Sequence, residues 1–215
     1  MTPEAVVSRV DRKGAGDTLD ESWWSRLPSI ALRRAQDGAD PLQSTVVRIA
    51  HDPGALLLRF DCTDRDIWAT HARRDARLWE EEVVELFVAP GEGDPSEYFE
   101  IEVNPIGAIF DARVSNPHGR RDSMRVDSAW NAEGLVAVVS RPSPGSWRAD
   151  IAIPWSALCE GTPPLVWRAN FFRIERPRDG EPEFSCWSPT FVDPPDFHKP
   201  ASFGRLELRG SGWRL

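Results

Sequence analysis

The sequence predicts an all-β protein, an antiparallel β-sandwich of the jelly-roll or immunoglobulin-like kind with little helix. From residue 44 onward, runs rich in β-branched and aromatic residues recur about every ten residues, as strands of a sandwich do. Clusters of Gly, Pro or Asn bound these runs, and several runs alternate apolar with polar residues. A helical turn is predicted only over residues 154–158, where a proline occupies a permitted first-turn position.

The first 40 residues predict a leading segment of short strand and turn pieces. Its apolar side chains are expected to cover one end of the core: Trp23, Trp24, Leu27, Ile30 and Leu32. A chain of 215 residues is long enough to bury a sizeable core as one unit. We therefore expect a single domain over residues 1–215, with residues 1–40 packed on it.

Two hairpins begin the regular series of strands. Residues 44–51 and 55–62 flank the turn Asp52-Pro53-Gly54, and residues 83–90 and 98–104 flank the loop GEGDPS. Seven further strands are predicted over residues 107–114, 123–130, 134–141, 146–154, 165–174, 183–189 and 203–209.

The second hairpin carries the most informative pattern of the chain. Because side chains alternate between the two faces of a strand, Val84, Leu86 and Val88 oppose Glu85. In the partner strand, Phe99, Ile101 and Val103 oppose Tyr98, Glu100, Glu102 and Asn104. The apolar rows can share a core, which leaves Glu85, Glu100, Glu102 and Asn104 on the opposite face, with Trp79 near its edge. So many like charges indicate a counterion, an arginine partner or a polyhydroxylated ligand, and a solvated outer sheet face is the alternative.

Composition narrows the classes of partner. The net charge of -8 argues against nucleic acid and favours a neutral or cationic ligand. No run reaches the length of a membrane span and no signal peptide is visible, so we expect a soluble cytoplasmic monomer, extracytoplasmic only if a leader was removed. The three cysteines predict neither a zinc site nor a disulfide framework, and most of the ten tryptophans are expected in the core.

Other chemistries stay open as alternatives. A glycoside hydrolase or lyase would use Glu85 with Glu102, although no linear catalytic motif supports an enzyme. A haem site would need Met124 with a histidine, and the four histidines are expected at the surface or in turns. No cofactor is firmly predicted, but structural calcium could bind in the loops DCTDRD (61–66) or GEGDPSE (91–97). The basic loop 116–121 could shape the rim of a site.

Several segments, taken in order, resemble the bacterial-type family 9 carbohydrate-binding modules and their relatives in the DOMON-like superfamily, which include haem binders. These segments are WEEEVVE (79–85), YFEIEVNPIGAIFD (98–111), DIAIPWSAL (150–158), WRANFFRIE (167–175), SCWSPT (185–190) and FHKPASFGRLEL (197–208). The resemblance implies a β-sandwich that binds a mono- or oligosaccharide without catalysis, between two aromatic rings on a concave face.

Carried over residue by residue, the resemblance assigns Trp79 as the first stacking ring, Glu85 as the acceptor carboxylate and Asn104 as an amide of the next strand. Phe197 takes the place of the second ring, with Trp187 and His198 as neighbours. Glu102 stands where sugar-binding members carry a basic residue. The resemblance therefore implies a ligand-binding set of seven residues: Trp79, Glu85, Glu102, Asn104, Trp187, Phe197 and His198.

Overall fold

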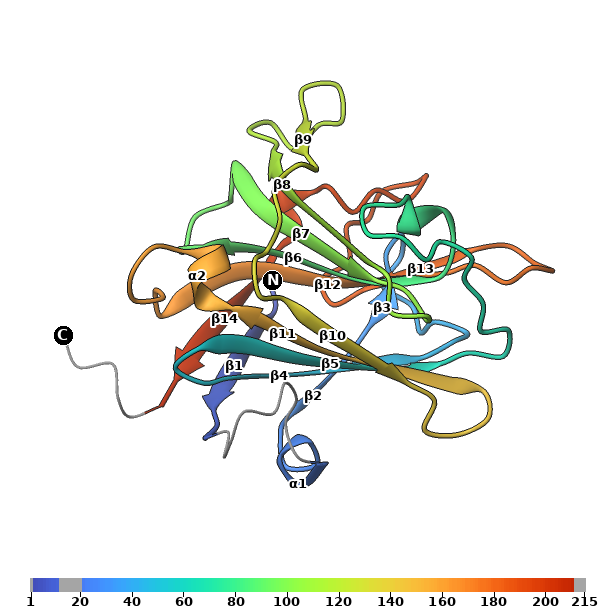
Figure 1. The fold of residues 1–215 in the computed structure, drawn as a ribbon. Helices are drawn as coiled ribbons and strands as arrows, with labels where there is room; N and C mark the ends of the chain where they lie inside the picture. The colour runs from blue at the N-terminus through green and yellow to red at the C-terminus, as the bar shows by residue number, and fades with distance from the viewer. Residues whose placement is uncertain (1, 12–20, 211–215) are drawn as a thin grey trace.

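A computed structural model describes residues 2–11 and 21–210, and fourteen strands form a curled sheet in this part of the chain (Figure 1). One half of the sheet runs in the order β10 (Val136–Ser140), β11 (Ser146–Pro154), β5 (Ala55–Thr63), β4 (Thr45–His51) and β1 (Glu4–Arg9). The other half continues with β14 (Gly204–Arg209), β12 (Val166–Glu175), β6 (Val83–Pro90), β7 (Glu97–Val103), β8 (Ile109–Ser115) and β9 (Arg125–Asp127). The two halves face each other as the layers of a sandwich.

Short strands and helical turns complete the described fold. β2 (Ser29–Ala31) pairs with β4, and β13 (Glu183–Cys186) pairs with both β12 and β3 (Arg33–Arg34). The helices are single turns: α1 (Glu21–Trp24), α2 (Trp155–Leu158) and the 3₁₀ turns η1 (Leu78–Glu80) and η2 (Pro200–Ser202). No helix in residues 2–11 and 21–210 is long and apolar enough to cross a membrane.

The predicted all-β sandwich with little helix is confirmed, with one difference in strand direction. β1 pairs in parallel with both β14 and β4, whereas the other pairings in the described residues are antiparallel. This parallel junction joins the first and the last described strand and links the two halves of the sheet. The predicted strand over 123–130 is confined to Arg125–Asp127, and α1 was not predicted.

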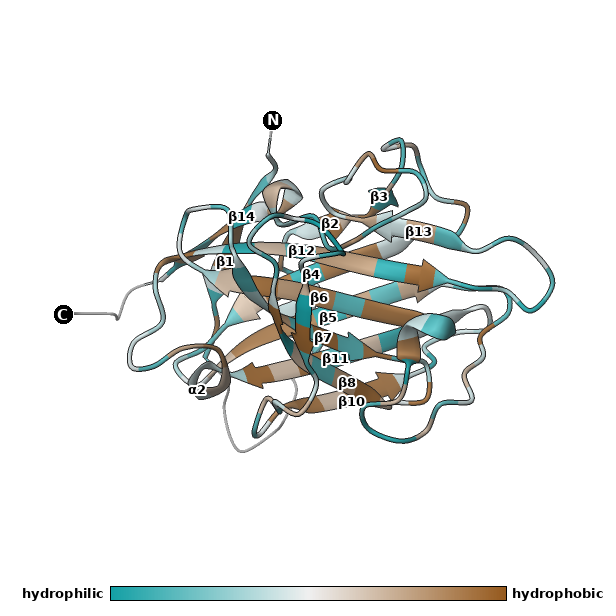
Figure 2. Ribbon diagram, turned by 90° about the horizontal axis from the view of Figure 1, so that it is seen from above, coloured by the Kyte–Doolittle hydropathy of each residue, from teal (hydrophilic) through white to brown (hydrophobic). Residues whose placement is uncertain are grey.

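The main core lies between the two layers, where Leu58 of β5 and Phe171 of β12 belong to the same apolar cluster as Leu86 of β6. Figure 2 shows apolar residues concentrated along the strands and hydrophilic residues in the loops at their ends. A small cluster under α1 covers the outer face of β4 and β5 and includes Trp24 and Leu27.

A third cluster decides where the functional site lies. It covers the outer face of β6, β7, β8 and β12, the face expected to carry the carboxylates. Segment 195–203 contributes Phe197 and Phe203, so this face is buried rather than solvated. Among the histidines, the expectation of surface positions is wrong for His51 and His198, because apolar and aromatic side chains enclose both.

Candidate functional site

A cavity of about 270 Å³ opens on the outer face of β6, β7 and β8. Three carboxylic acids, Glu85, Glu100 and Glu102, form its floor. Aromatic rings and two arginines contribute to the walls and rim, and the lining residues include Trp79, Phe110, Arg121, Met124, Arg176, Phe184, Phe197 and His198. Five of the seven residues assigned from the sequence therefore line one cavity.

The pairing of β6 with β7 brings the three acids together. Glu85 lies directly opposite Glu102, and Phe87 lies opposite Glu100. Strand alternation puts these side chains on the face away from the main core, as the sequence pattern predicted. At least one carboxylate oxygen from each acid lies within 4.8 Å of one from each of the others.

Burial makes this arrangement electrostatically costly. Glu85, Glu100 and Glu102 are each no more than 5% exposed. Burial raises the pKa of Glu100 to about 7, although a hydrogen bond from Glu102 and the charge of Arg121 act in the opposite direction. Burial, followed by the charges of neighbouring acids, raises the pKa of both Glu85 and Glu102 well above the ordinary range. The floor therefore holds protons at neutral pH unless a ligand supplies compensating donors or charge.

Trp79 lies at the mouth of the cavity, on the 3₁₀ turn Leu78–Glu80, and is 38% exposed. Its ring meets Phe110 edge to face, with 5.2 Å between the centroids. The loop before it is fixed by Glu81, which accepts hydrogen bonds from the backbone N–H groups of Thr70 at 2.6 Å and His71 at 3.2 Å. The tryptophan is therefore a partly exposed ring held on an anchored loop.

His198 and Phe197 also line the cavity. The ring of Phe197 stacks on Phe172, with centroids 4.3 Å apart, so one of its faces is already covered. Nδ1 of His198 lies 2.7 Å from the Tyr98 hydroxyl, and Nε2 lies 3.9 Å from Oε1 of Glu100. Burial lowers the pKa of His198 to about 3, and the charge of Arg121 adds to this effect. The imidazole is consequently neutral at pH 7 and does not balance the charge of Glu100.

Two of the assigned residues do not line the cavity. Asn104 is fully buried, donates to the carbonyl of His71 at 2.8 Å and accepts from the N–H groups of Ile106 at 3.2 Å and Ala108 at 2.9 Å. It thus shapes the turn after β7 and tethers the loop that leads to Trp79.

Trp187 packs against the main core beside Phe171, with 5.5 Å between the ring centroids. Its ring lies over Gly204, where any side chain would overlap it. The aromatic wall is instead completed by Phe110 and Phe184, which the sequence assignment did not include. Phe110 could have been predicted from strand pairing, because it lies opposite Glu102 in the β7–β8 pairing.

A second group of acids, Asp64, Glu82 and Glu175, is also close enough to surround a cation. Asp64 comes from the loop DCTDRD, one of the two loops in which the sequence indicates that calcium could bind. The guanidinium of Arg173 already lies among these acids, with Nη2 at 3.1 Å from Asp64 and 3.4 Å from Glu82. All of these side chains are buried, so this cluster is an internal ion-pair network.

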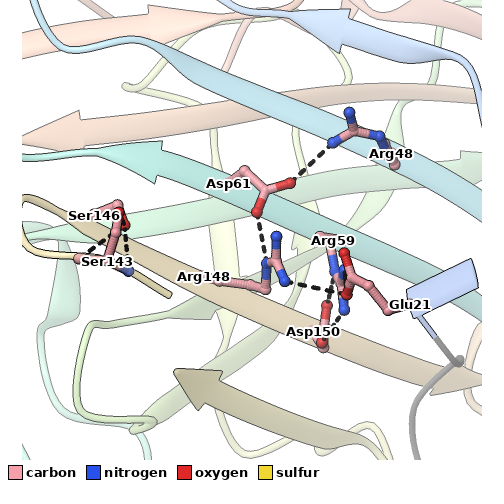
Figure 3. Close-up of polar contacts among 8 residues, drawn as sticks. All are labelled: Glu21, Arg48, Arg59, Asp61, Ser143, Ser146, Arg148 and Asp150. Carbon is pink, nitrogen blue, oxygen red and sulfur yellow. Dashed lines mark hydrogen bonds and ion pairs between the residues drawn. The ribbon is translucent and has the colours of Figure 1, made fainter. Parts of the chain in front are cut away.

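The outer face of β4, β5 and β11 carries a further polar network, shown in Figure 3. Arg59 binds Asp150 through two hydrogen bonds of 2.6 and 2.8 Å. Asp61 accepts from Arg48 at 2.9 Å and from Arg148 at 2.6 Å. Because the arginines on this face pair with acids of the same face, it has no excess of one charge comparable to that of the cavity floor.

Comparison with known proteins identifies relatives over most of the chain. The model of carbohydrate-binding family 9 matches residues 40–208. A protein of Arthroderma benhamiae named extracellular protein is 28% identical over 175 residues, which cover 77% of this chain and 79% of that protein.

Solved structures share the fold at low sequence identity. A proposed carbohydrate-binding protein of Bacteroides uniformis superposes with a TM-score of 0.78 at 22% identity, covering 96% of this chain and 99% of that one. A family 9 module of Caldicellulosiruptor kristjanssonii in complex with cellotriose has a TM-score of 0.66 at 13% identity, covering 98% and 95%. A glucose complex of a family 9 module from the same organism gives 0.64 at 12% identity, covering 99% and 98%.

Proposed function

This chain belongs to carbohydrate-binding family 9, and from that premise we propose that it binds a saccharide non-covalently in the cavity beneath Trp79. The observation that carries the proposal is the combination of a partly exposed indole at the mouth with carboxylic acids on the floor that form no ion pair with a lysine or arginine of the described residues. The cellotriose and glucose complexes of structurally similar family 9 modules support the same class of ligand.

The chemistry of a sugar matches both parts of the cavity. The C–H face of a sugar ring is apolar and can cover the indole, whereas its hydroxyl groups donate hydrogen bonds. Hydrogen bonds to a charged acceptor contribute about 1.5 to 3 kcal/mol each. Glu85 and Glu102 are placed to accept them, since both lie on the floor and neither forms an ion pair with an arginine or lysine in the described residues.

The size of the cavity favours a single sugar unit. Pockets for drug-sized ligands begin at about 300 Å³, and this cavity measures about 270 Å³. A monosaccharide, or the terminal unit of a longer chain whose remainder lies in solvent, therefore fits this proposal better than an internal segment of a polysaccharide.

The hydrolase alternative uses the same acids in different roles. A raised pKa in a cleft is a property of catalytic acids, which is the observation in favour of this alternative. Glycosidases, however, place their two carboxyl groups on either side of the scissile bond. Glu85 and Glu102 are direct cross-strand neighbours on one floor, so a sugar would lie above both.

Calorimetric titration with a panel of monosaccharides and short oligosaccharides tests the proposal, with Trp79→Ala as the informative variant. Trp130→Ala is the matched control, because Trp130 is a half-buried tryptophan whose ring packs against Phe99 outside the cavity. We expect Trp79→Ala to lose about 2 kcal/mol of binding, roughly 30-fold in affinity, and the control to bind like wild type. Equal affinity of both variants would refute the site. Release of product from aryl glycosides would favour the hydrolase, and a Soret band in the purified protein would favour the haem alternative.

A further inference from the structure

The cavity floor has three acids, and the described residues provide no cation that is paired with them. No Lys or Arg nitrogen in the described part of the chain forms an ion pair with Glu85, Glu100 or Glu102. Arg121 lies at the rim, but its Nε donates to Asp196 at 2.9 Å. The guanidinium of Arg176 contacts the carbonyl of Trp79 at 3.5 Å and the ring of Phe184 instead.

One oxygen of this floor is left without a donor. Oε2 of Glu102 is buried and has no hydrogen-bond partner among the residues that the structure describes. The side chain is 1% exposed and lines the cavity. A buried acceptor without a donor is unfavourable, because it has lost its hydrogen bonds to water without replacement. This oxygen therefore marks a point where a ligand donor is missing.

We propose that the preferred ligand is an amino sugar, whose protonated amine is bound among Glu85, Glu100 and Glu102 while its ring covers Trp79. The inference rests on the proposed function and specifies the class of saccharide. An ammonium group has three N–H donors, and the floor offers three carboxylates whose oxygens lie within 4.8 Å of one another. A neutral hydroxyl in the same place would bring one donor and no charge.

The walls favour an organic cation over a metal ion. Calcium takes six to eight oxygen ligands, whereas the cavity next to the floor presents the rings of Trp79, Phe110 and Phe197. Aromatic faces attract ammonium groups and the C–H bonds beside them. An amine carried on a sugar ring uses both the acids and the aromatic wall.

Titration calorimetry at pH 7 with D-glucosamine, D-glucose, N-acetyl-D-glucosamine, cyclohexylamine and CaCl₂ tests this inference. We expect glucosamine to bind about 10- to 100-fold more tightly than glucose and N-acetylglucosamine, because only its amine is charged. Glu102→Gln should reduce the ratio of glucosamine to glucose affinity at least about tenfold. Glu97→Gln is the matched control, since Glu97 lies on the same strand but is exposed and outside the cavity. The wild-type affinity ratio is informative even if Glu102→Gln does not fold.

The outcomes distinguish the amino-sugar inference from the proposed saccharide-binding function on which it rests. If glucose binds and glucosamine binds no more tightly, the amino-sugar inference is wrong and saccharide binding stands. If no sugar binds, both are wrong. Cyclohexylamine binding as tightly as glucosamine would overturn the need for a sugar ring. Calcium binding that Glu102→Gln abolishes, without any preference for glucosamine, would make the floor a metal site and would also overturn the inference.

Discussion

Glu102→Gln should stabilise the unliganded protein, and the gain should grow with pH. Gln has nearly the shape of a protonated Glu, so the variant mimics the state that burial imposes on Glu102 at low pH. As the pH rises, Glu102 of the folded wild type must either stay protonated at a pH where the unfolded chain has lost this proton, or ionise beside Glu85 and Glu100. The variant avoids this choice, because an amide does not ionise.

The raised pKa of Glu102 sets the direction of the effect. Above pH 4.5 the unfolded chain releases this proton while the folded state keeps it, so wild type loses up to about 1.4 kcal/mol of stability per pH unit. The stabilisation is complete below the unfolded pKa of 4.5 and is lost as the pH rises through the raised pKa of the folded state. Glu85 and Glu100 also have raised pKa values, but both acids are present in both proteins, so they affect the difference only through their coupling to Glu102.

The pH window matters because another group titrates with the opposite sign. His198, with its pKa lowered to about 3, destabilises the folded state as the pH falls below the unfolded value of 6.5. Above pH 6.5 this contribution is absent. Glu82, whose pKa burial raises to about 8, titrates in both proteins and cancels in the difference between them.

Urea unfolding of wild type, Glu102→Gln and the control Glu97→Gln at pH 6.5 and 8.5 measures the effect. We expect Glu102→Gln to exceed wild type by at least about 1 kcal/mol at pH 8.5 and by less at pH 6.5, equivalent to roughly 2 to 4 °C per kcal/mol in Tm. Glu97→Gln should match wild type at both values. An equal loss of stability in Glu102→Gln at both pH values would refute the reasoning about a charged floor.

Three further predictions concern the frame around the cavity. Trp79→Ala should cost far less stability than Trp147→Ala, because Trp79 is 38% exposed and Trp147 is fully buried, where truncation costs roughly 3 to 5 kcal/mol; equal losses in thermal melts would contradict the exposed placement. Asn104→Ala should lower the free energy of unfolding in urea by about 1 to 3 kcal/mol. It should also weaken sugar binding, because Asn104 tethers the loop before Trp79 although it does not line the cavity; unchanged sugar affinity would contradict this positioning role. Gly204→Ala should cost about 1 to 3 kcal/mol, because its methyl group would overlap the Trp187 ring, and sugar affinity measured on the folded fraction should be retained; a stable variant would show that the ring can move away.

Strand periodicity predicted the part of the site that lies on regular elements. The alternation in residues 83–90 and 98–104 placed Glu85 and Glu102 on one face, and the register of β6 with β7 makes them direct neighbours. Side-chain parity is fixed by backbone geometry, so a sequence reveals it without any knowledge of the partner strand.

The covering of that face was not predictable in the same way. Segment 195–203 lies over the outer side of β6 and β7, and it converts an expected sheet surface into a buried floor. Its place depends on packing between residues more than 90 positions apart, such as the contact between His198 and Tyr98. Local sequence patterns do not reveal such long-range contacts.

The roles of Asn104 and Trp187 show the same limit. Asparagine and tryptophan both suit a sugar site, and the sequence assigned both residues to the ligand-binding set. Asn104 is instead occupied by backbone partners in its own turn, and Trp187 packs over Gly204, which has no side chain to keep it away. A residue type predicts what a side chain can bind, whereas its neighbours in space decide what it does bind.

A crystal structure of the protein with D-glucosamine, or with glucose if that binds more tightly, tests the central claim most directly. We predict the sugar ring within about 4.5 Å of the Trp79 indole, with polar atoms of the ligand about 2.6 to 3.2 Å from carboxylate oxygens of Glu85 and Glu102. A sugar bound elsewhere, for example in the groove beside Phe99 and Arg113, with the cavity beneath Trp79 empty, would contradict the account.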